Sequence, residues 1–325
     1  MDSLLAVEVV RRMGFEVLAL HFVVGYELGH LRTWLADPSG RFLEKASFET
    51  MQARVEVVDI REDFQRLLAD PPHGFGRNLN PCIDCKILML SKARERMEQE
   101  NAAFVFTGEV LGQRPMSQNR HSLDKIEKAA GLKNRLLRPL CGARLPPTQA
   151  EEDGLFSRSQ LFAIEGRSRK EQMELAQQLG ITDYPSPAGG CLLTDPQYAR
   201  RLRDWLKHRG LEKMTPDESA LLLIGRHIRL PAGGKAIIGR HQADNDGILR
   251  FSSLGGLMEA VDVPGPTTLL LEPMDATDIQ AAGRLTGRYG KAKDQDRVSL
   301  QIRWPDGRQE TIESPPGEPE GVYIL

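Results

Sequence analysis

The chain of 325 residues is long enough for two domains, and 40% hydrophobic with 27% charged residues is the composition of an ordinary globular protein. No apolar run of about eighteen residues occurs and the N-terminus has none of the zones of a signal peptide, so the sequence excludes a helical membrane protein and predicts a cytoplasmic one with no membrane partner. The formal net charge of -2 excludes a strong overall attraction to nucleic acid, yet residues 199–241 carry ten Lys or Arg against four Asp or Glu, which permits a local basic patch.

Helices and strands alternate in the first hundred residues. Apolar residues at helical spacing predict a helix over Ser3–Met13, and nearly continuous apolar runs predict strands over 15–24, 55–60 and 102–108, with a helix over Ile83–Gln99. Strands separated by helices predict an α/β fold with a doubly wound parallel sheet. Such a domain normally begins with a strand and a glycine-rich turn, whereas this chain opens directly with a helix, so we expect its first strand to be missing.

The character of the chain changes beyond a basic helix that we predict over Gln197–Gly210. After this helix, short apolar runs are separated by Gly, Pro, Asn and Asp turns, as in a small α+β domain of about a hundred residues. The sequence therefore predicts an α/β domain over residues 1–195, a basic helical linker over 196–217 and a smaller C-terminal α+β domain over 218–325.

Polar residues stand where the predicted strands end, which is where ligands bind in doubly wound sheets. Residues 107–118 leave the third predicted strand through Gly108 and present polar side chains at its carboxyl end, although a plain surface loop is the alternative. Asp2 and Ser3 open a helix whose free N–H groups and dipole favour an anion. A Ser or Asp at such a position is more often an ordinary N-cap.

Four cysteines form too few disulfide bonds to stabilise a chain of this length, so paired thiols indicate metal or redox chemistry. Two residues separate Cys82 from Cys85, a spacing at which both thiolates reach one metal, and the start of the predicted helix would lower their pKa toward the ligating form. Cys191, in a glycine-rich loop, is the candidate third ligand, and a three-ligand site leaves one coordination position open. A redox pair or thiols that merely pack are the alternatives, and Cys141 is expected to be a packed residue.

Several short motifs, in the same order, resemble those of a known enzyme superfamily. "MDS" ahead of an apolar helix resembles the end of the SGGxDS pyrophosphate loop of PP-loop ATP pyrophosphatases, and "TGEVLGQRPMSQ" with "LLRPL" resembles the tRNA 4-thiouridine synthetase branch. "NPCIDCK" with "PAGGCLLT" resembles the three-cysteine, iron–sulfur type of tRNA thiolation enzyme, and the resemblance covers roughly residues 1–195. The chain departs from the pattern because the loop's Ser-Gly-Gly is absent, so either Met1 is an internal start within an original "SGGMDS" or ATP hydrolysis has been lost.

The resemblance implies thiolation of a uridine in tRNA with ATP and Mg²⁺. In such enzymes the uridine carbonyl oxygen attacks the α-phosphate, and sulfide from a sulfur donor then displaces AMP; in the iron–sulfur type, three cysteines hold a [4Fe-4S] cluster with one iron free to carry sulfide, Zn²⁺ being the alternative metal. The implied catalytic residues are Asp2 and Ser3, and the implied cluster ligands are Cys82, Cys85 and Cys191. The implied ATP-binding residues are Ser3, His21, Phe22, Thr107, Gly108, Gln113 and Gln118.

Residues 220–325 resemble, more loosely, the small NFACT-type RNA-binding domain through "IRLPAGGKAIIGRHQADN" and "VPGPTTLLLEP". RNA phosphates would be bound by basic residues of the preceding helix and of the stretch beyond it, with strong salt dependence. A solvated helix face is the alternative. The candidates are Arg200, Arg201, Arg203, Lys207 and Arg209 in the helix, and Arg226, Arg229, Lys235 and Arg240 beyond it.

Two classes of function follow from these patterns. The first is an ATP-dependent tRNA-thiolating enzyme whose partners are tRNA and a sulfur donor. The second is a non-catalytic RNA-binding protein with a structural metal site and a degenerate ATP site; a PP-loop enzyme acting on a small molecule, with zinc on the cysteines, is a third option. Asp84 and Lys86, beside the cysteine pair, are expected to be solvated helix residues.

Overall fold

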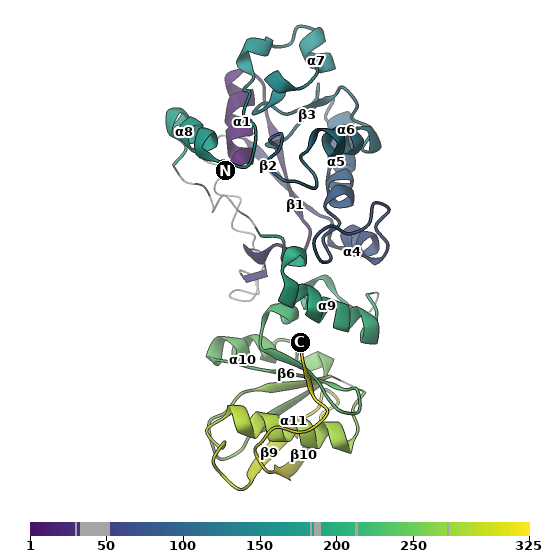
Figure 1. Cartoon of the computed structure of the whole chain (residues 1–325), viewed down its shortest axis with the longest axis vertical. Helices are drawn as coiled ribbons and strands as arrows, with labels where there is room; N and C mark the ends of the chain where they lie inside the picture. The colour runs from purple at the N-terminus through teal and green to yellow at the C-terminus, as the bar shows by residue number, and fades with distance from the viewer. Residues whose placement is uncertain (30, 33–52, 183, 185–189, 212–213, 272) are drawn as a thin grey trace. The chain divides into compact units, whose positions relative to one another are not determined.

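The computed structural model describes residues 1–29, 31–32, 53–182, 184, 190–211, 214–271 and 273–325. Within them the chain forms two compact units, which divide mainly between Thr194 and Asp195 (Figure 1). Residues 185–189 of the glycine-rich loop ahead of Cys191 and residues 212–213 of the predicted linker lie outside the described residues. In none of the described helices do length and hydropathy together suffice to cross a bilayer.

The N-terminal unit has helices and strands at most of the predicted positions. It begins with α1, Asp2–Arg12, which buries an apolar face, and continues through β1, Leu18–Val23, and β2, Arg54–Asp59. The predicted helix behind the cysteine pair is α5, Cys82–Gln99. The remaining elements are α4 (Arg61–Ala69), β3 (Val105–Phe106), α6 (Arg120–Ala129), β4 (Leu136–Leu137), η1 (Gly142–Arg144), α7 (Gln149–Glu152), η2 (Arg158–Gln160), α8 (Lys170–Leu179) and η3 (Leu192–Thr194).

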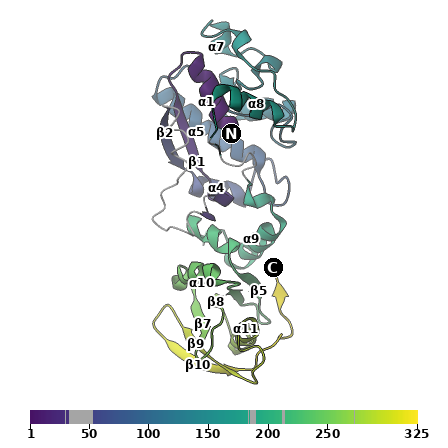
Figure 2. The same ribbon diagram turned by 90° about the vertical axis from the view of Figure 1, so that its left-hand side faces the viewer.

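The described strands of this unit form two separate parallel pairs. β1 lies beside β2, with Leu18 opposite Arg54 and Val23 opposite Asp59 (Figure 2), and β3 lies beside β4. β3 is shorter than the strand predicted over 102–108. A single doubly wound sheet that joins the two pairs stays a prediction.

Helices cover both faces of the β3–β4 pair. Phe104 and Phe106 pack in one apolar cluster with Val7 and Val10 of α1, whereas Val105 packs in another with α5. Because successive side chains of a strand point to opposite faces, α1 and α5 lie on opposite sides of β3 (Figure 1). This is the layer order of an α/β domain.

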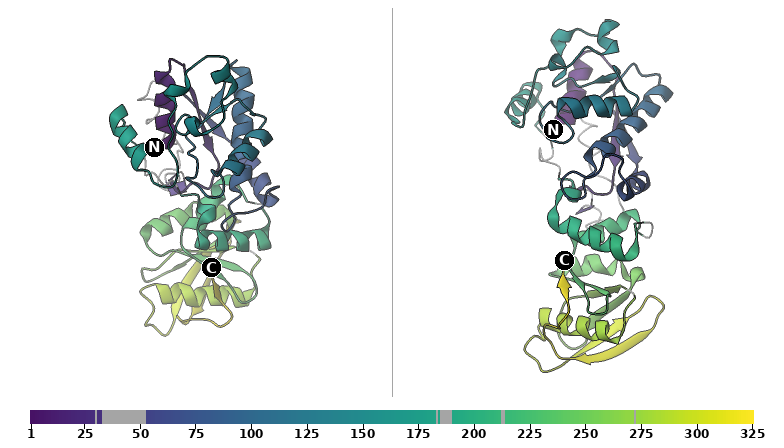
Figure 3. Two further views of the ribbon diagram at one scale, coloured as in Figure 1. Left: turned by 45° about the horizontal axis from the view of Figure 1, so that its top comes forward. Right: turned by 45° about the vertical axis from the view of Figure 1, so that its right-hand side comes forward.

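The C-terminal unit is built on a seven-stranded antiparallel sheet of order β10-β9-β7-β8-β6-β5-β11. α11, Ala276–Tyr289, lies along one face of this sheet (Figure 3), and its Ala282 and Leu285 share an apolar core with strand residues such as Ile302. The alternation of buried and half-buried residues in β9 is the period-2 pattern of a strand with one covered face. The elements are α9 (Pro196–Arg209), η4 (Pro216–Leu223), β5 (Arg226–Arg229), β6 (Lys235–Ile238), α10 (Gln242–Leu249), η5 (Ser252–Leu254), β7 (Gly256–Ala260), β8 (Thr268–Leu271), α11, β9 (Val298–Arg303), β10 (Gln309–Ser314) and β11 (Tyr323–Ile324).

α9, which lies in the predicted linker, packs as part of the C-terminal unit. Its Trp205 is fully buried, and its Tyr198 hydroxyl donates a hydrogen bond to the carbonyl oxygen of Ser219 at 2.9 Å. Its Asp204 pairs with both Arg229 and Lys235 of the first two sheet strands. The helix therefore extends the unit beyond the sheet itself.

Candidate functional site

A cavity of about 580 Å³ lies in the N-terminal unit, with both β1 and β3 in its lining. Its polar end is where α1 begins and β3 ends, so residues about a hundred positions apart in the sequence meet there. His21 and Gln113 are not among the described residues that line it. The predicted catalytic and ATP-binding residues that do line it are Asp2, Ser3, Phe22, Thr107, Gly108 and Gln118.

Gly108 allows the start of α1 to approach the end of β3. A Cβ atom on Gly108 would come within 2.6 Å of the Ser3 backbone nitrogen and closer still to the Asp2 carbonyl group. Only a residue without a side chain fits this approach. The first backbone N–H groups of α1 are thereby held against the end of β3.

Three oxygen atoms of the cavity lining are buried without a hydrogen-bond partner in the described part of the chain. They belong to Asp2 (Oδ1), Glu109 (Oε1) and Gln118 (Oε1). The other Asp2 oxygen accepts a hydrogen bond from Gln113 Nε2 at 3.0 Å, so Gln113 orients Asp2 although it does not line the cavity. Buried acceptors without partners are costly, and hydroxyl or amino groups of a ligand, or Mg²⁺, could satisfy them.

Glu109, in the lining of the cavity, is the centre of a buried charge network. Its carboxylate pairs with Arg138 at 3.2 Å and lies 3.7 Å from Lys86 Nζ. Burial alone raises the pKa of Glu109, but Lys86 and then Arg138 oppose this and hold the pKa below its usual value. Arg138 is shared with Glu127 at 2.9 Å, so the charges are compensated on both sides.

The expectation that Asp84 is solvated is wrong, whereas the side chain of Lys86 is 30% exposed. Asp84 is only 4% exposed because its carboxylate accepts hydrogen bonds from the backbone N–H of His73 at 3.0 Å and pairs with the His73 ring at 2.5 Å. Lys86 lines the cavity and faces Glu109. The charges of α5 are therefore used to fix a loop and to supply positive potential to the cavity.

The three predicted ligand thiols lie near one another. Cys82 begins α5 and lines the cavity, and its Sγ donates to Ser117 Oγ at 3.3 Å. Cys191 forms an isolated antiparallel bridge with Glu27. Burial, with a smaller contribution from the charge of Cys82, raises the pKa of Cys85 to about 12 and that of Cys191 to about 11. The thiols are thus close enough for their charges to interact.

The expectation that the helix start lowers the thiol pKa is wrong for Cys85, because burial outweighs it. A bound metal ion would reverse this balance, since its charge deprotonates a coordinating thiol. Soft, mutually interacting sulfur donors fit a thiophilic metal, but among the described residues no three Cys, His, Asp or Glu side chains converge as ligands. The cluster and its zinc alternative stay predictions. Cys141 is fully buried, as expected.

The predicted RNA-binding residues of the C-terminal unit divide into those that are exposed and those that contact other residues of the unit. Arg200, Arg203 and Lys207 of α9 are exposed and have no polar partner in the described ranges. Arg209 of the same helix lies over the ring of Trp205, 4.9 Å from its centroid. Exposed cations without internal partners are the ones that can bind phosphates without breaking another contact.

The other basic candidates make contacts inside the unit. Arg229 and Lys235 share the carboxylate of Asp204, with Lys235 Nζ at 2.7 Å, and burial lowers the pKa of Lys235 to about 8. Arg226 lies over the ring of Tyr289, 4.4 Å from its centroid. Arg201 donates to the carbonyl oxygen of Leu222 at 2.8 Å. Their contacts with RNA stay predictions.

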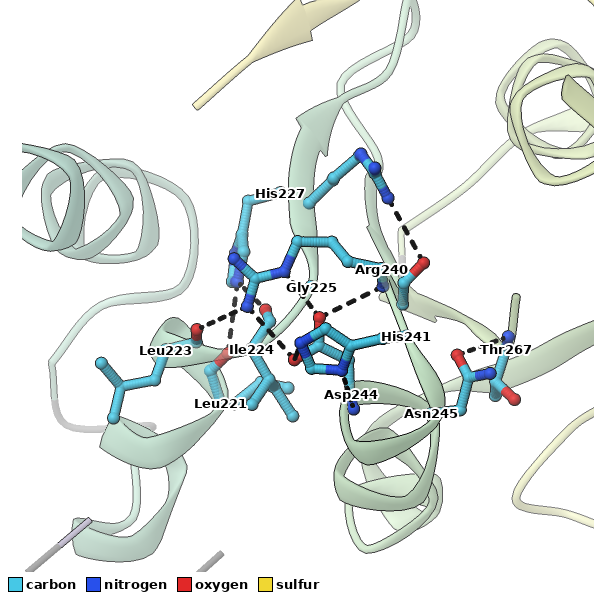
Figure 4. Close-up of polar contacts among 12 residues, drawn as sticks. Leu221, Leu223, Ile224, Gly225, His227, Arg240, His241, Asp244, Asn245 and Thr267 are labelled. Atoms are coloured by element: carbon cyan, nitrogen blue, oxygen red, sulfur yellow. Dashed lines mark hydrogen bonds and ion pairs between the residues drawn. The ribbon is translucent and has the colours of Figure 1, made fainter. Parts of the chain in front are cut away.

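Arg240 belongs to a polar network around the start of α10 (Figure 4). Its Nε pairs with Asp244 at 2.6 Å, and its Nη2 donates to the carbonyl oxygen of Leu223 at 3.4 Å. The buried His227 ring places Nε2 at 3.2 Å from the Leu221 carbonyl oxygen and at 3.0 Å from that of Ile224, so Nε2 carries the proton. Burial holds the pKa of His227 well below its usual value, which keeps the ring neutral.

Comparison with known proteins identifies only the C-terminal part. Residues 225–322 match the NFACT protein RNA binding domain. No curated protein matches the chain. Among solved structures, the C-terminal part of the fibronectin/fibrinogen-binding protein from Streptococcus suis aligns at 14% identity over 73% of this chain and 91% of that one, with a TM-score of 0.26, which is too low to indicate a shared fold.

Three charged residues of the N-terminal site, Lys86, Arg114 and Arg138, were not among the sequence candidates, whereas Glu109 is one of the polar residues expected at the carboxyl end of the third predicted strand. Glu109, Lys86 and Arg114 line the cavity, and Arg138 holds Glu109 from behind. Glu109 directly follows the Thr107-Gly108 pair, and Arg138 stands in "LLRPL", so both were inside motifs already singled out. Lys86 ends the "NPCIDCK" motif, and only the register of α5, one turn beyond Cys82, could have indicated that it faces the cavity.

Proposed function

We propose that this chain is an ATP-dependent RNA-thiolating enzyme that acts on a uridine of tRNA. The observation that carries the proposal is the polar end of the cavity, where the start of α1, the end of β3 and the Cys82 thiol share one lining. The groups that we propose to bind the nucleotide thus share one cavity with a thiol. The match of residues 225–322 to the NFACT protein RNA binding domain supports RNA as the partner.

The N-terminal unit would bind the triphosphate through the start of α1 and nearby cations. No described side chain caps α1, so the first N–H groups of the helix are open to an anion, and Ser3 adds a hydroxyl donor. Lys86 and Arg114 supply positive charge to the same cavity. Asp2 and Gln118 offer acceptors to Mg²⁺ or to the ribose, and Thr107 lines the wall beside them.

The chemistry has two displacement steps. The uridine carbonyl oxygen forms a bond to the α-phosphorus of ATP and pyrophosphate leaves; sulfide then forms a bond to the activated ring carbon and AMP leaves with the former carbonyl oxygen. Cations around the phosphates stabilise the charge that develops in the first step. Cys82, Cys85 and Cys191 would hold the metal or cluster, which supplies the sulfide when bound.

The RNA would be held by the C-terminal unit through the exposed face of α9. Arg200, Arg203 and Lys207 recur at spacings of three and four residues, which places them on one side of the helix. Phosphate contacts of this kind give affinity without reading bases. Base recognition would then be a task of the matched domain.

ATP binding tests the nucleotide part of the proposal. Ser3→Ala should weaken binding of ATP with Mg²⁺ about ten- to a hundredfold, since a hydrogen bond to a charged group is worth about 1.5–3 kcal/mol. Ser91→Ala on α5, outside the described cavity lining, is the matched control and should bind ATP like the wild type. The binding is measured by equilibrium dialysis on the full chain.

An assay of sulfur transfer tests the proposed thiolation of RNA. The full chain, reconstituted anaerobically with iron and sulfide, should convert a uridine of unmodified tRNA to thiouridine in the presence of ATP, as read by mass spectrometry of the digested RNA. Cys82→Ser should abolish this product, whereas Cys141→Ala should retain it. A chain that binds RNA but neither ATP nor sulfide would instead be the non-catalytic RNA-binding protein that the sequence leaves as the alternative.

A further inference from the structure

The loop of residues 71–81, between α4 and α5, places an aromatic side chain on the surface. Its Phe75 is 43% exposed. No other phenylalanine, tyrosine or tryptophan in the described part of the N-terminal unit has so large an exposed fraction. Single exposed apolar residues are common on proteins, so exposure alone does not indicate a site. The contacts of the loop distinguish Phe75 from such a residue.

The backbone of the loop is fixed on both sides of Phe75. On one side, the backbone N–H and the ring of His73 both bind the buried carboxylate of Asp84. On the other side, Asn78 Nδ2 donates a hydrogen bond to the carbonyl oxygen of Thr194 at 2.8 Å. A loop that is already held in place loses little conformational entropy when a ligand binds to it.

Glycines flank Phe75 in the sequence. Gly74 has a φ of +69°, in the left-handed region that favours glycine. A Cβ on Gly76 would come within 2.1 Å of Met116 Sδ, so the Met116 side chain packs against the backbone of the loop. Neither neighbour of Phe75 therefore carries a side chain that could cover its ring.

The loop adjoins the cavity of the N-terminal unit. Cys82, which lines the cavity, directly follows the loop. Met116, which contacts Gly76, lies two residues beyond Arg114, and Arg114 both lines the cavity and is exposed. An exposed residue of the lining marks the opening of a cavity. The loop therefore lies beside that opening.

The two segments that meet there are positively charged. Residues 71–83 contain Arg77 and residues 110–119 contain Arg114, and neither segment contains Asp or Glu. Arg77 and Arg114 are exposed and make no hydrogen bond or ion pair with the described residues. One aromatic ring offers too little apolar area for a stable protein interface, which buries about 800 Å² on each partner. An aromatic ring beside cations suits an unpaired nucleobase and its phosphates.

We propose that the loop of residues 71–81 is a contact site for single-stranded RNA, at which Phe75 stacks on an unpaired base and Arg77 binds a neighbouring phosphate. The inference rests on the proposed function in one respect, which is that the cavity acts on RNA. It adds a requirement on the substrate, because a nucleotide close to the reacting uridine must be unpaired. Every base has a face that can stack, so the contact selects unpaired strands and not a sequence.

Photochemical cross-linking locates the contact. A single-stranded RNA that carries 5-iodouridine is bound to the full chain and irradiated, and the cross-linked residue is identified by mass spectrometry of the digested protein. Phe75 should be among the cross-linked residues, and the variant Phe75→Ala should lose the cross-link in this loop. Cross-links confined to the C-terminal unit would overturn the proposal.

The affinity for RNA tests the stacking itself. Phe75→Ala should weaken binding of a uridine-rich single-stranded RNA about five- to a hundredfold, whereas Phe75→Trp should retain it, because tryptophan also stacks on bases. Leu155→Ala is the matched control, since it removes another exposed apolar side chain of the same unit and should bind like the wild type. A cross-link to Phe75 without a loss of affinity in Phe75→Ala would mean that the ring lies beside the RNA without stacking, which overturns the proposal.

These outcomes are distinct from those that test the proposed function. Cross-linking and binding need neither ATP nor sulfide, so a chain that passes both tests but forms no thiouridine would keep the contact site and refute the thiolation. Thiouridine formation at the same rate and RNA affinity by the wild type and by Phe75→Ala would do the reverse.

Discussion

Gly108 is the residue at which one added methyl group should disturb the cavity most. Gly108→Ala places a Cβ against the backbone of Asp2 and Ser3, which cannot move aside as a flexible side chain does. We expect a loss of about 1–3 kcal/mol in the free energy of unfolding, together with weaker ATP binding, because the start of α1 is displaced. Urea titration and equilibrium dialysis measure the two effects.

Gly29→Ala is the matched control for this change. A Cβ on Gly29 meets nothing within 4 Å, so its effect on unfolding should stay within about 0.5 kcal/mol. Equal stability of the two variants would mean that the start of α1 does not lie against Gly108.

Glu109 is a buried charge whose removal should cost more than that of an exposed one. Glu109→Gln leaves the buried Arg138 and the nearby Lys86 without their shared carboxylate, and breaking such a pair costs about 3–5 kcal/mol. Glu165→Gln is the control, since its partner Arg144 is 48% exposed and surface pairs are worth at most about 1 kcal/mol. Denaturant unfolding of the two variants at pH 7 gives the comparison.

The same carboxylate predicts a pH dependence. Burial raises the pKa of Glu109, but Lys86 and Arg138 together hold it below the 4.5 of the unfolded chain. The group therefore contributes stability above pH 4.5, and the contribution is lost as the pH falls through the lower, folded pKa. The difference in unfolding free energy between the wild type and Glu109→Gln should shrink below that pH. A difference that grows on acidification would contradict the direction of the shift.

Lys235 predicts a change in the free energy of unfolding at alkaline pH. Burial lowers its pKa to about 8, against 10.5 in the unfolded chain, although Asp204 opposes the shift. Between these values the unfolded chain binds a proton that the folded chain has lost, so stability rises with pH by about 3 kcal/mol. Lys235→Met should remove this rise while Arg229 still pairs with Asp204, and the exposed Lys207→Met should keep it. The free energies of unfolding of the wild type and of the two variants, measured at pH 7.5 and 10.5, test this prediction.

At the scale of elements, α9 is the part of the C-terminal unit that should bind RNA phosphates. Replacing Arg200, Arg203 and Lys207 by Ala should weaken RNA binding and lower the slope of log affinity against log salt by about 2, at about 0.7 per phosphate contact on single strands. The control removes the same charge from exposed residues of the same unit, Lys291, Lys293 and Arg297. Filter binding between 50 and 200 mM salt measures both. Because these control residues lie in the matched domain, equal losses in the two triple variants would mean that α9 has no special part in phosphate binding.

The sequence located most elements because their local patterns are strong. The apolar face of α1, the continuous run at β1 and the helix behind Cys82 all appear where the periodicity predicts them. β3 is an exception: an apolar run over 102–108 yields a strand of only Val105–Phe106. The length of a strand depends on the partner it pairs with, and periodicity carries no information about that partner.

The candidate site was only partly predictable, because contacts between distant segments decide which side chains are used. The ends of the predicted strands indicated Asp2, Thr107 and Gln118, since topology alone brings such ends together. The pairing of Glu109 with Arg138 could not be foreseen, because it depends on the packing of side chains twenty-nine positions apart. Charge counting likewise could not tell that Lys235 faces Asp204 while Lys207 stays exposed.

At the scale of the molecule, the C-terminal unit should need α9 for its stability. The family match covers residues 225–322, but Asp204 of α9 carries the carboxylate that Arg229 and Lys235 share, and Lys235 is only 2% exposed. A fragment of residues 195–325 should therefore unfold cooperatively, whereas one of residues 216–325 should be less stable by about 3 kcal/mol or more, since it keeps a buried charge without its partner and loses the packing of Trp205.

Asp204→Asn in the longer fragment separates the two causes, because it removes the charge and leaves α9 in place. If Asp204→Asn lowers the free energy of unfolding by most of the difference between the two fragments, the ion pairs are the main cause of that difference. If it lowers it only a little, the burial of Trp205 is the main cause. Equal denaturation midpoints for the two fragments would instead show that the matched domain folds alone. In that case the exposed cations of α9 would sit on a separable arm, and the RNA affinity of the shorter fragment would report the matched domain without them.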